Sequence, residues 1–72
     1  MKLSEAQQTA RLAILREVVK SGNLDDWAHL HSRGHHFKQV MACVRRGDLE
    51  MLRPYHFRIT PAGRAALERE RK

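Results

Sequence analysis

The sequence predicts a single α+β domain, mostly helical, in which three helices are followed by a short β-hairpin and a C-terminal helix. Three observations predict this order. Apolar residues recur at helical spacing up to residue 46, the apolar period changes to two after Gly47, and a helix-start pattern follows at Thr60-Pro61. A chain of 72 residues has room for one small hydrophobic core, so one domain is expected over residues 1–72.

The first helix is predicted over residues 5–20. Ser4 followed three residues later by Gln7 is a capping-box pattern, and Gly22 is a stop signal just beyond the last periodic position. The apolar residues of this segment share one face of a helical wheel. They are Leu12, Ile14, Leu15, Val18 and Val19. The opposite face carries both charge signs, so we expect a supporting helix.

A second, shorter helix is predicted over residues 24–32. Asn23 is a suitable N-cap residue, and Asp25 and Asp26 would then lie in the first turn, where the helix dipole favours acids. The spacing of Trp27 from the apolar residue before it places the indole ring in the core.

The third helix, over residues 36–46, has the most regular apolar pattern in the chain. Its residues at i, i+3, i+4 and i+7 are expected to face the core, and they are Phe37, Val40, Met41 and Val44. Cys43 lies beside this stripe and is expected to be a small, partly buried residue. Gly47 ends the helix. The arc opposite the stripe has no acidic residue and carries His35, Lys38, Gln39, Ala42, Arg45 and Arg46.

A β-hairpin is predicted over residues 49–59. Apolar residues alternate with polar or charged residues on both sides of a tip near Arg53-Pro54. A last helix is predicted over residues 61–70, with Thr60 as N-cap and Pro61 at the favoured first position.

The net charge of +6 is concentrated in the second half of the chain. Residues 1–32 hold equal numbers of basic and acidic residues, whereas residues 33–58 hold six Lys or Arg against two Asp or Glu. This distribution predicts a neutral supporting segment followed by a surface that faces a polyanion.

The order of elements and one junction resemble a known family. The segment FRITPAGRAALE at residues 57–68 is similar to the strand-to-helix junction of bacterial winged-helix transcriptional regulators, in which a strand ends in a Leu/Ile-Thr pair before a helix with an early glycine. Over about residues 10–70, the chain resembles the winged helix-turn-helix family of DNA-binding domains.

The resemblance implies that the helix over residues 36–46 is a recognition helix in the major groove of double-stranded DNA, and that the hairpin is a wing on the sugar-phosphate backbone. It implies that the early helix residues lie nearest the base edges, where Gln39 can read adenine, and that Arg45 and Arg46 meet phosphates. The side chains assigned to DNA are His35, His36, Lys38, Gln39, Ala42, Arg45, Arg46, Arg53, His56 and Arg58.

The function expected from these observations is that of a regulator of transcription, in a bacterial cytoplasm or nucleoid, that binds double-stranded DNA. A homodimer would read two half-sites, with the first and last helices as the dimer faces. Two alternatives stay open. One is a small phage-type protein-binding module that inhibits a host enzyme or a defence nuclease. The other is an architectural DNA binder without sequence preference.

The sequence predicts neither an enzyme nor a metalloprotein. One cysteine excludes a disulfide within the chain, and the five histidines and this cysteine form no motif with zinc-finger spacing. No oxyanion hole or oriented third residue is indicated beside Cys43. No apolar run is long enough to predict a membrane span. We expect no cofactor and no small-molecule ligand.

Overall fold

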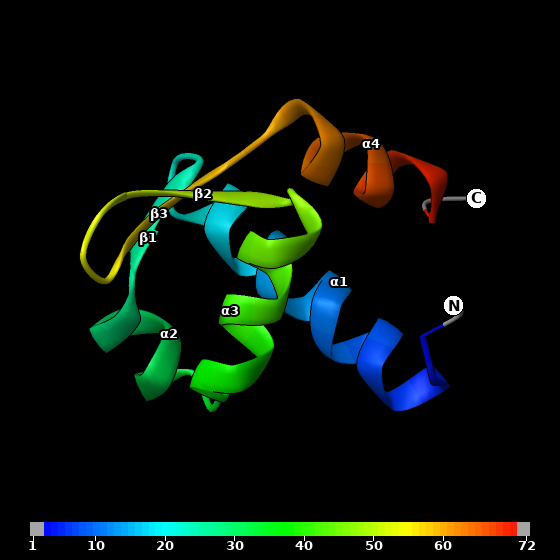
Figure 1. The fold of residues 1–72 in the computed structure, drawn as a ribbon, viewed down its shortest axis with the longest axis horizontal. Coiled ribbons are helices and arrows are strands. Elements are labelled where there is room, and N and C mark those ends of the chain that lie inside the picture. The colour runs from blue at the N-terminus through cyan, green and yellow to red at the C-terminus, as the bar shows by residue number, and fades with distance from the viewer. Residues whose placement is uncertain (1–2, 71–72) are drawn as a thin grey trace.

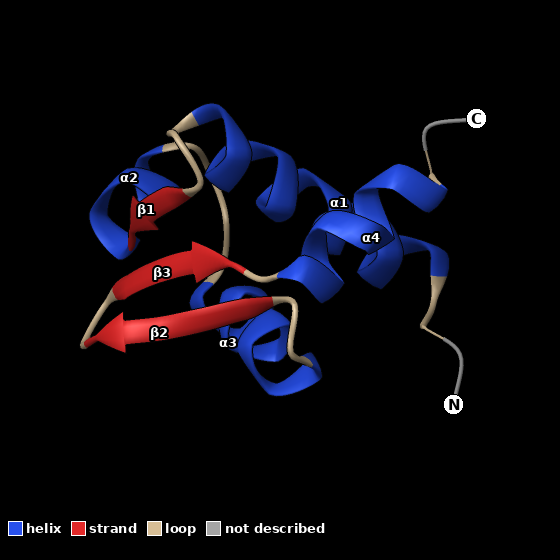
Figure 2. Ribbon diagram, turned by 90° about the horizontal axis from the view of Figure 1, so that it is seen from above, coloured by secondary structure: helices blue, strands red, loops and turns tan. Residues whose placement is uncertain are grey.

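The computed structural model describes residues 3–70, which form four helices and one antiparallel sheet. The elements are α1 (Glu5–Lys20), β1 (Leu24–Asp26), α2 (Trp27–Ser32), α3 (Phe37–Arg46), β2 (Leu49–Arg53), β3 (His56–Ile59) and α4 (Pro61–Arg69). The strands lie in the order β1-β3-β2, so β3 is central (Figures 1 and 2). The predicted α+β class is confirmed, with a hairpin between the third and fourth helices.

Local signals place most element ends where the sequence predicts them. The capping box of α1 is formed, because Ser4 Oγ accepts from the Gln7 amide and Gln7 Oε1 accepts from the Ser4 amide. Gly47 ends α3 in the left-handed conformation, with φ 88°. Thr60 caps α4 by accepting a hydrogen bond of 3.0 Å from the Gly63 amide.

The predicted helix over residues 24–32 is wrong in its first three residues, which form strand β1. Asn23 does not cap a helix but has a positive φ of 72°, which turns the chain out of α1. Residues 24–26 then pair with β3, with Asp25 opposite Phe57. The N-cap is Asp26, whose carboxylate accepts from the His29 amide at 2.8 Å. A three-residue strand is too short to show alternation, so its partner strand determines it.

The hydrophobic core lies between α1, α3 and the inner face of the sheet. α1 contacts α3, α4 and β3, and α3 contacts β2. The fully buried apolar side chains include Ile14, Leu15, Val18, Leu30, Val40, Cys43 and Phe57. The face predicted for the first helix is therefore confirmed.

Helix α3 is turned about its axis relative to the predicted orientation. Val40 and Cys43 are fully buried, Met41 and Val44 are partly buried, and Phe37 is 39% exposed. At 100° per residue, the buried direction lies between Val40 and Cys43, about 80° from the centre of the predicted stripe. The placement of Phe37 in the core is wrong because its ring packs against Trp27 and Tyr55 at the molecular surface. Cys43 takes the core position as a small apolar side chain.

A buried carboxylate joins three parts of the fold. Asp48, 2% exposed, accepts hydrogen bonds from Arg11 Nε at 2.7 Å and Arg11 Nη2 at 3.0 Å. This hydrogen bond raises the pKa of the Arg11 guanidinium above its ordinary value. The Asp48 carbonyl accepts from the Thr60 amide at 3.0 Å, so α1, the α3–β2 turn and the start of α4 meet at this residue. The sequence pattern did not indicate this pairing, because the two residues are far apart in the chain.

Candidate nucleic-acid interface

The outward face of α3 carries two cations and a small side chain. Lys38 and Arg45 lie seven residues apart, which is two turns of helix, and both are exposed. Ala42 lies between them and is partly buried. All three lie on the side opposite the buried Val40 and Cys43. Within residues 3–70, neither Lys38 nor Arg45 forms an ion pair, so both charges are available to a ligand.

Gln39 and Arg46, two of the other predicted DNA contacts, lie on the flank of α3. They are also seven residues apart, about 100° around the helix from Lys38 and Arg45. Gln39 is half-buried. Arg46 Nε lies 3.7 Å from the buried Asp48 carboxylate, and Arg46 Nη2 lies 3.9 Å from the Cys43 sulfur. The charge of Arg46 is therefore partly compensated inside the protein.

The three predicted contacts of the hairpin differ in what surrounds them. Arg58 lies directly opposite Glu50 in the sheet and forms an ion pair with it. His56 Nδ1 donates to the Pro54 carbonyl at 3.0 Å. Arg53 is exposed, next to the turn at Pro54-Tyr55, and has no ion-pair partner in the part of the chain that the structure describes. Arg53 is thus the hairpin cation that remains free to meet a phosphate.

The two predicted histidines precede α3. His35 is half-buried and His36 is exposed. His36 is the N-cap residue of α3, and its side chain makes no capping hydrogen bond. Both lie at the end of α3 from which Lys38 projects. Another histidine, His29, lies in α2 and hydrogen-bonds Asp25 at 2.9 Å, and this bond raises the pKa of His29.

Sequence analysis missed a row of aromatic rings that joins three elements. Trp27 of α2 contacts His31 at 5.2 Å and Phe37 at 5.1 Å between ring centroids, and Phe37 contacts Tyr55 of the hairpin turn at 6.0 Å. The Trp27 amide also donates to the Tyr55 carbonyl at 2.9 Å. Trp27 is partly buried against the core, as predicted, whereas Phe37 and Tyr55 are exposed. Periodicity within one segment could not indicate this row, because its members come from three segments.

The hairpin tip therefore lies beside the start of α3. Figures 1 and 2 both show the β2–β3 turn and α2 at one end of the molecule, and the start of α1 and the end of α4 at the other. The structure brings together Lys38, Ala42 and Arg45 on α3, with Arg53 and the two exposed rings at the hairpin end.

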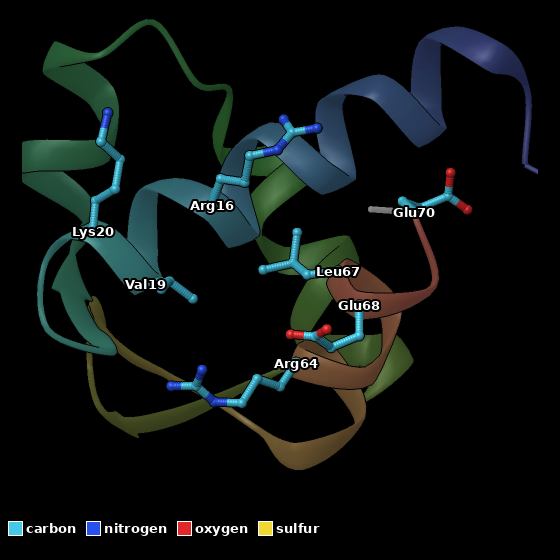
Figure 3. A pocket seen from close by; sticks show the side chains of 7 residues that line it. All are labelled: Arg16, Val19, Lys20, Arg64, Leu67, Glu68 and Glu70. Atoms are coloured by element: carbon cyan, nitrogen blue, oxygen red, sulfur yellow. The ribbon is translucent and has the colours of Figure 1, made fainter. Parts of the chain in front are cut away.

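A second surface feature lies between α1 and α4. Side chains from both helices line an open groove of about 380 Å³ (Figure 3). The lining residues are Arg16, Val19, Lys20, Arg64, Leu67, Glu68 and Glu70. Lys20 and Arg64 lie toward one end of the groove, Glu70 lies at the other, and the apolar Val19 and Leu67 lie between them (Figure 3).

The described residues also bear on metal binding, membrane spanning and thiol reactivity. In residues 3–70, no three His, Cys, Asp or Glu side chains gather closely enough to hold a metal ion. None of the four helices has the length and apolar character needed to cross a bilayer, as judged over the same residues. Burial raises the pKa of the Cys43 thiol to about 11, so the thiol is protonated at neutral pH and is a poor nucleophile.

Comparison with models of protein families, with curated proteins and with solved structures finds no match to this chain.

Proposed function

We propose that the chain binds double-stranded DNA and regulates transcription, with α3 in the major groove and the hairpin on the sugar-phosphate backbone. The observation that carries this proposal is the outward face of α3, where Lys38 and Arg45 flank Ala42 and no acid is present. An α-helix fits the major groove, and cations on its exposed face can reach phosphates or guanine edges. The small Ala42 allows the helix to approach closely and can contact a thymine methyl group.

The element order supports a winged helix-turn-helix arrangement for this proposal. The hairpin follows α3 directly, and its tip lies beside the start of that helix through the Phe37–Tyr55 contact. Arg53 next to the tip can then meet a phosphate beside the groove that α3 occupies. Because α3 is turned from the predicted orientation, Lys38 and Arg45 take the central positions, and Gln39 and Arg46 lie on the flank.

The groove between α1 and α4 supports a homodimer as the DNA-binding form. A two-fold axis through its apolar centre would bring Glu70 of one copy to Lys20 and Arg64 of the other, because an isologous interface pairs each patch with itself. Two copies would place two α3 helices on two half-sites and double the number of phosphate contacts.

A salt titration of binding to duplex DNA tests the proposal. Three cations without an ion-pair partner predict that log K falls against log salt with a slope of roughly −3 or steeper. Lys38→Ala and Arg45→Ala should each make the slope shallower by about 1 for every copy bound to the duplex. Arg69→Ala, an exposed cation at the far end of α4, is the matched control and should leave the slope unchanged.

Two results would count against DNA binding through α3. One is the absence of duplex binding at low salt. The other is binding that depends on Arg69 as strongly as on Lys38 and Arg45, since the contact would then be general attraction to a basic chain. A protein that binds no DNA but still produces an effect in cells would favour the protein-binding alternative. The α1–α4 groove is the candidate surface for that alternative.

A further inference from the structure

Two aromatic rings stay exposed where the hairpin tip meets the start of α3. Phe37 is 39% exposed and Tyr55 is 55% exposed, and their centroids lie 6.0 Å apart. Trp27 packs against Phe37 edge-on, with 5.1 Å between the ring centroids. Packing explains the inner ring of this row, but it does not explain why the outer two present so much of their surface to solvent. Exposed rings beside a binding surface are typical of ligand contacts.

The backbone at Tyr55 has a conformation that glycine, asparagine or aspartate adopts more readily than tyrosine. Tyr55 has a positive φ of 66°, in a two-residue turn where Gly, Asn or Asp is favoured. A bulky side chain in this region is uncommon and costs about 1 kcal/mol or more. The contact with Phe37 and the hydrogen bond from the Trp27 amide hold the residue there. These two contacts therefore hold the Tyr55 ring at the tip of the hairpin.

The charges around the two rings indicate a polyanion rather than an apolar partner. Lys38 follows Phe37 directly, and Arg53 precedes the turn that carries Tyr55. The segments 34–47 and 51–57 contain no acidic residue. The two acids of β1 are engaged within the fold: Asp26, opposite His56 in the sheet, caps α2, and Asp25 hydrogen-bonds His29.

We propose that Tyr55 and Phe37 bind a nucleobase that is unpaired and unstacked, while Lys38 and Arg53 hold the phosphates on either side of it. The ligand is then a DNA duplex that carries a single-stranded overhang. This inference rests on the proposed function, because α3 would hold the duplex beside the aromatic pair. Any of the four bases can stack on such a ring, whereas bases inside a duplex are already stacked and cannot reach it.

Three DNA probes test the inference. The first is a short blunt duplex. The second is the same duplex with a single-stranded thymine tail on one strand, and the third carries on that strand an abasic tail with the same number of phosphates. The thymine tail should be bound about 5- to 150-fold more tightly than the abasic tail, since each stacked base contributes in that range. This ratio should stay nearly constant as salt is raised, because stacking releases no counterions, whereas duplex binding itself weakens.

Three variants assign the effect to the ring. Tyr55→Phe keeps an aromatic face and should keep the preference for the thymine tail. Tyr55→Leu keeps an apolar side chain and should lose most of it. Leu24→Ala, which shortens a 51% exposed side chain on β1, is the matched control and should change nothing. Thermal melting of each variant establishes that it is folded before its affinity is compared.

The outcomes separate this inference from the proposed function. Equal affinity for thymine and abasic tails, with the blunt duplex still bound, overturns the base site and leaves duplex binding intact. Loss of the preference in Tyr55→Leu together with its retention in Tyr55→Phe supports the base site. Tight binding of the tailed probe without any binding of the blunt duplex supports the base site and overturns duplex binding by α3. Binding of none of the probes overturns both.

Discussion

Cys43 shows how a single residue reports the orientation of α3. Its side chain is fully buried, and burial raises the pKa of the thiol to about 11, although the nearby Arg46 acts in the opposite direction. A thiol with this pKa is only about 0.1% thiolate at pH 8, and the thiolate is the reactive form. Both the burial and the protonation state should therefore protect Cys43 from labelling.

We predict that the folded protein reacts slowly with a thiol reagent such as Ellman's reagent at pH 8. The observed rate should follow unfolding rather than the chemistry of the thiol, and it should become fast in denaturant. Any labelling that occurs within the folded state should keep rising with pH up to about 11, because the thiolate fraction increases until the pH reaches the raised pKa. Rapid labelling under native conditions would mean that Cys43 is accessible to the reagent, and it would contradict the full burial of this side chain.

Two of the three N-caps predicted from the sequence formed, whereas Asn23 caps no helix because residues 24–26 pair with β3. The Ser4–Gln7 capping box and the Thr60 cap both formed, because their partners lie three residues away. Arg46 and Arg58 could not be judged in the same way. Their charges are offset by Asp48 and Glu50 in the fold, and a pairing such as Glu50 with Arg58 depends on strand register. Counting charges along the chain overestimates how many of them a ligand can reach.

At the scale of elements, period and caps predicted the four helices and the hairpin, but not which face of α3 is buried. The predicted face was the one with the most apolar side chains on the helical wheel, so Phe37 was assigned to the core and Cys43 to its edge. In the fold, the ring of Phe37 is drawn to Trp27 and Tyr55, which belong to other elements. The same reason explains β1, whose three residues are recognisable only through β3.

The orientation of α3 predicts an unequal pair of substitutions. Val40→Ala removes atoms from a fully buried site and should lower the free energy of unfolding by about 2 kcal/mol. Phe37→Ala removes a larger side chain, but one that is partly exposed and packs mainly on other rings, so it should cost only about 1–2 kcal/mol. Denaturant unfolding measures both values. If Phe37→Ala were much the more damaging, Phe37 would belong to the core after all.

The junction between β3 and α4 predicts a different kind of defect. A Cβ at Gly63 would lie 2.3 Å from the Asp48 carbonyl oxygen, which is backbone and cannot rotate away. Gly63→Ala should therefore displace α4 and cost about 1–3 kcal/mol, even though alanine is the better helix former. Ala65→Gly, at an exposed position of the same helix, provides the comparison and should cost at most about 1 kcal/mol. A Gly63→Ala variant as stable as the parent would contradict the close approach of α4 to the turn.

At the scale of the whole molecule, the sequence indicated which half of the chain carries the net positive charge, but not which residues form its surface features. The charge-balanced residues up to 32 form α1, β1 and α2, and the basic residues 33–58 include α3 and the hairpin. The aromatic row and the α1–α4 groove were not predicted, because each is assembled from segments far apart in the chain. Surfaces of this kind depend on tertiary packing, which neither composition nor period specifies.

The α1–α4 groove predicts a charge-swap result for the whole assembly. In the proposed two-fold dimer, Lys20 of one copy faces Glu70 of the other, and the pair occurs twice. Lys20→Glu or Glu70→Lys alone would put like charges opposite each other and should weaken dimerisation by about tenfold, since each exposed pair contributes a fraction of 1 kcal/mol. The double variant Lys20→Glu/Glu70→Lys restores opposite charges between positions 20 and 70 and should recover part of the dimer, because Arg64 of the other copy still lies near position 70. Sedimentation equilibrium measures each constant.

The same variants predict the effect of dimerisation on DNA. The single variants should lose affinity for DNA with two half-sites but keep their affinity for a single half-site, because α3 and the hairpin are unchanged. The double variant should regain part of the affinity for two half-sites and bind a single half-site as the parent does. A parent protein that stays monomeric at all concentrations, or a double variant no better than either single one, would show that the groove does not join two copies. If the parent were monomeric and still bound DNA with one α3 per site, the groove would be left to a different protein partner.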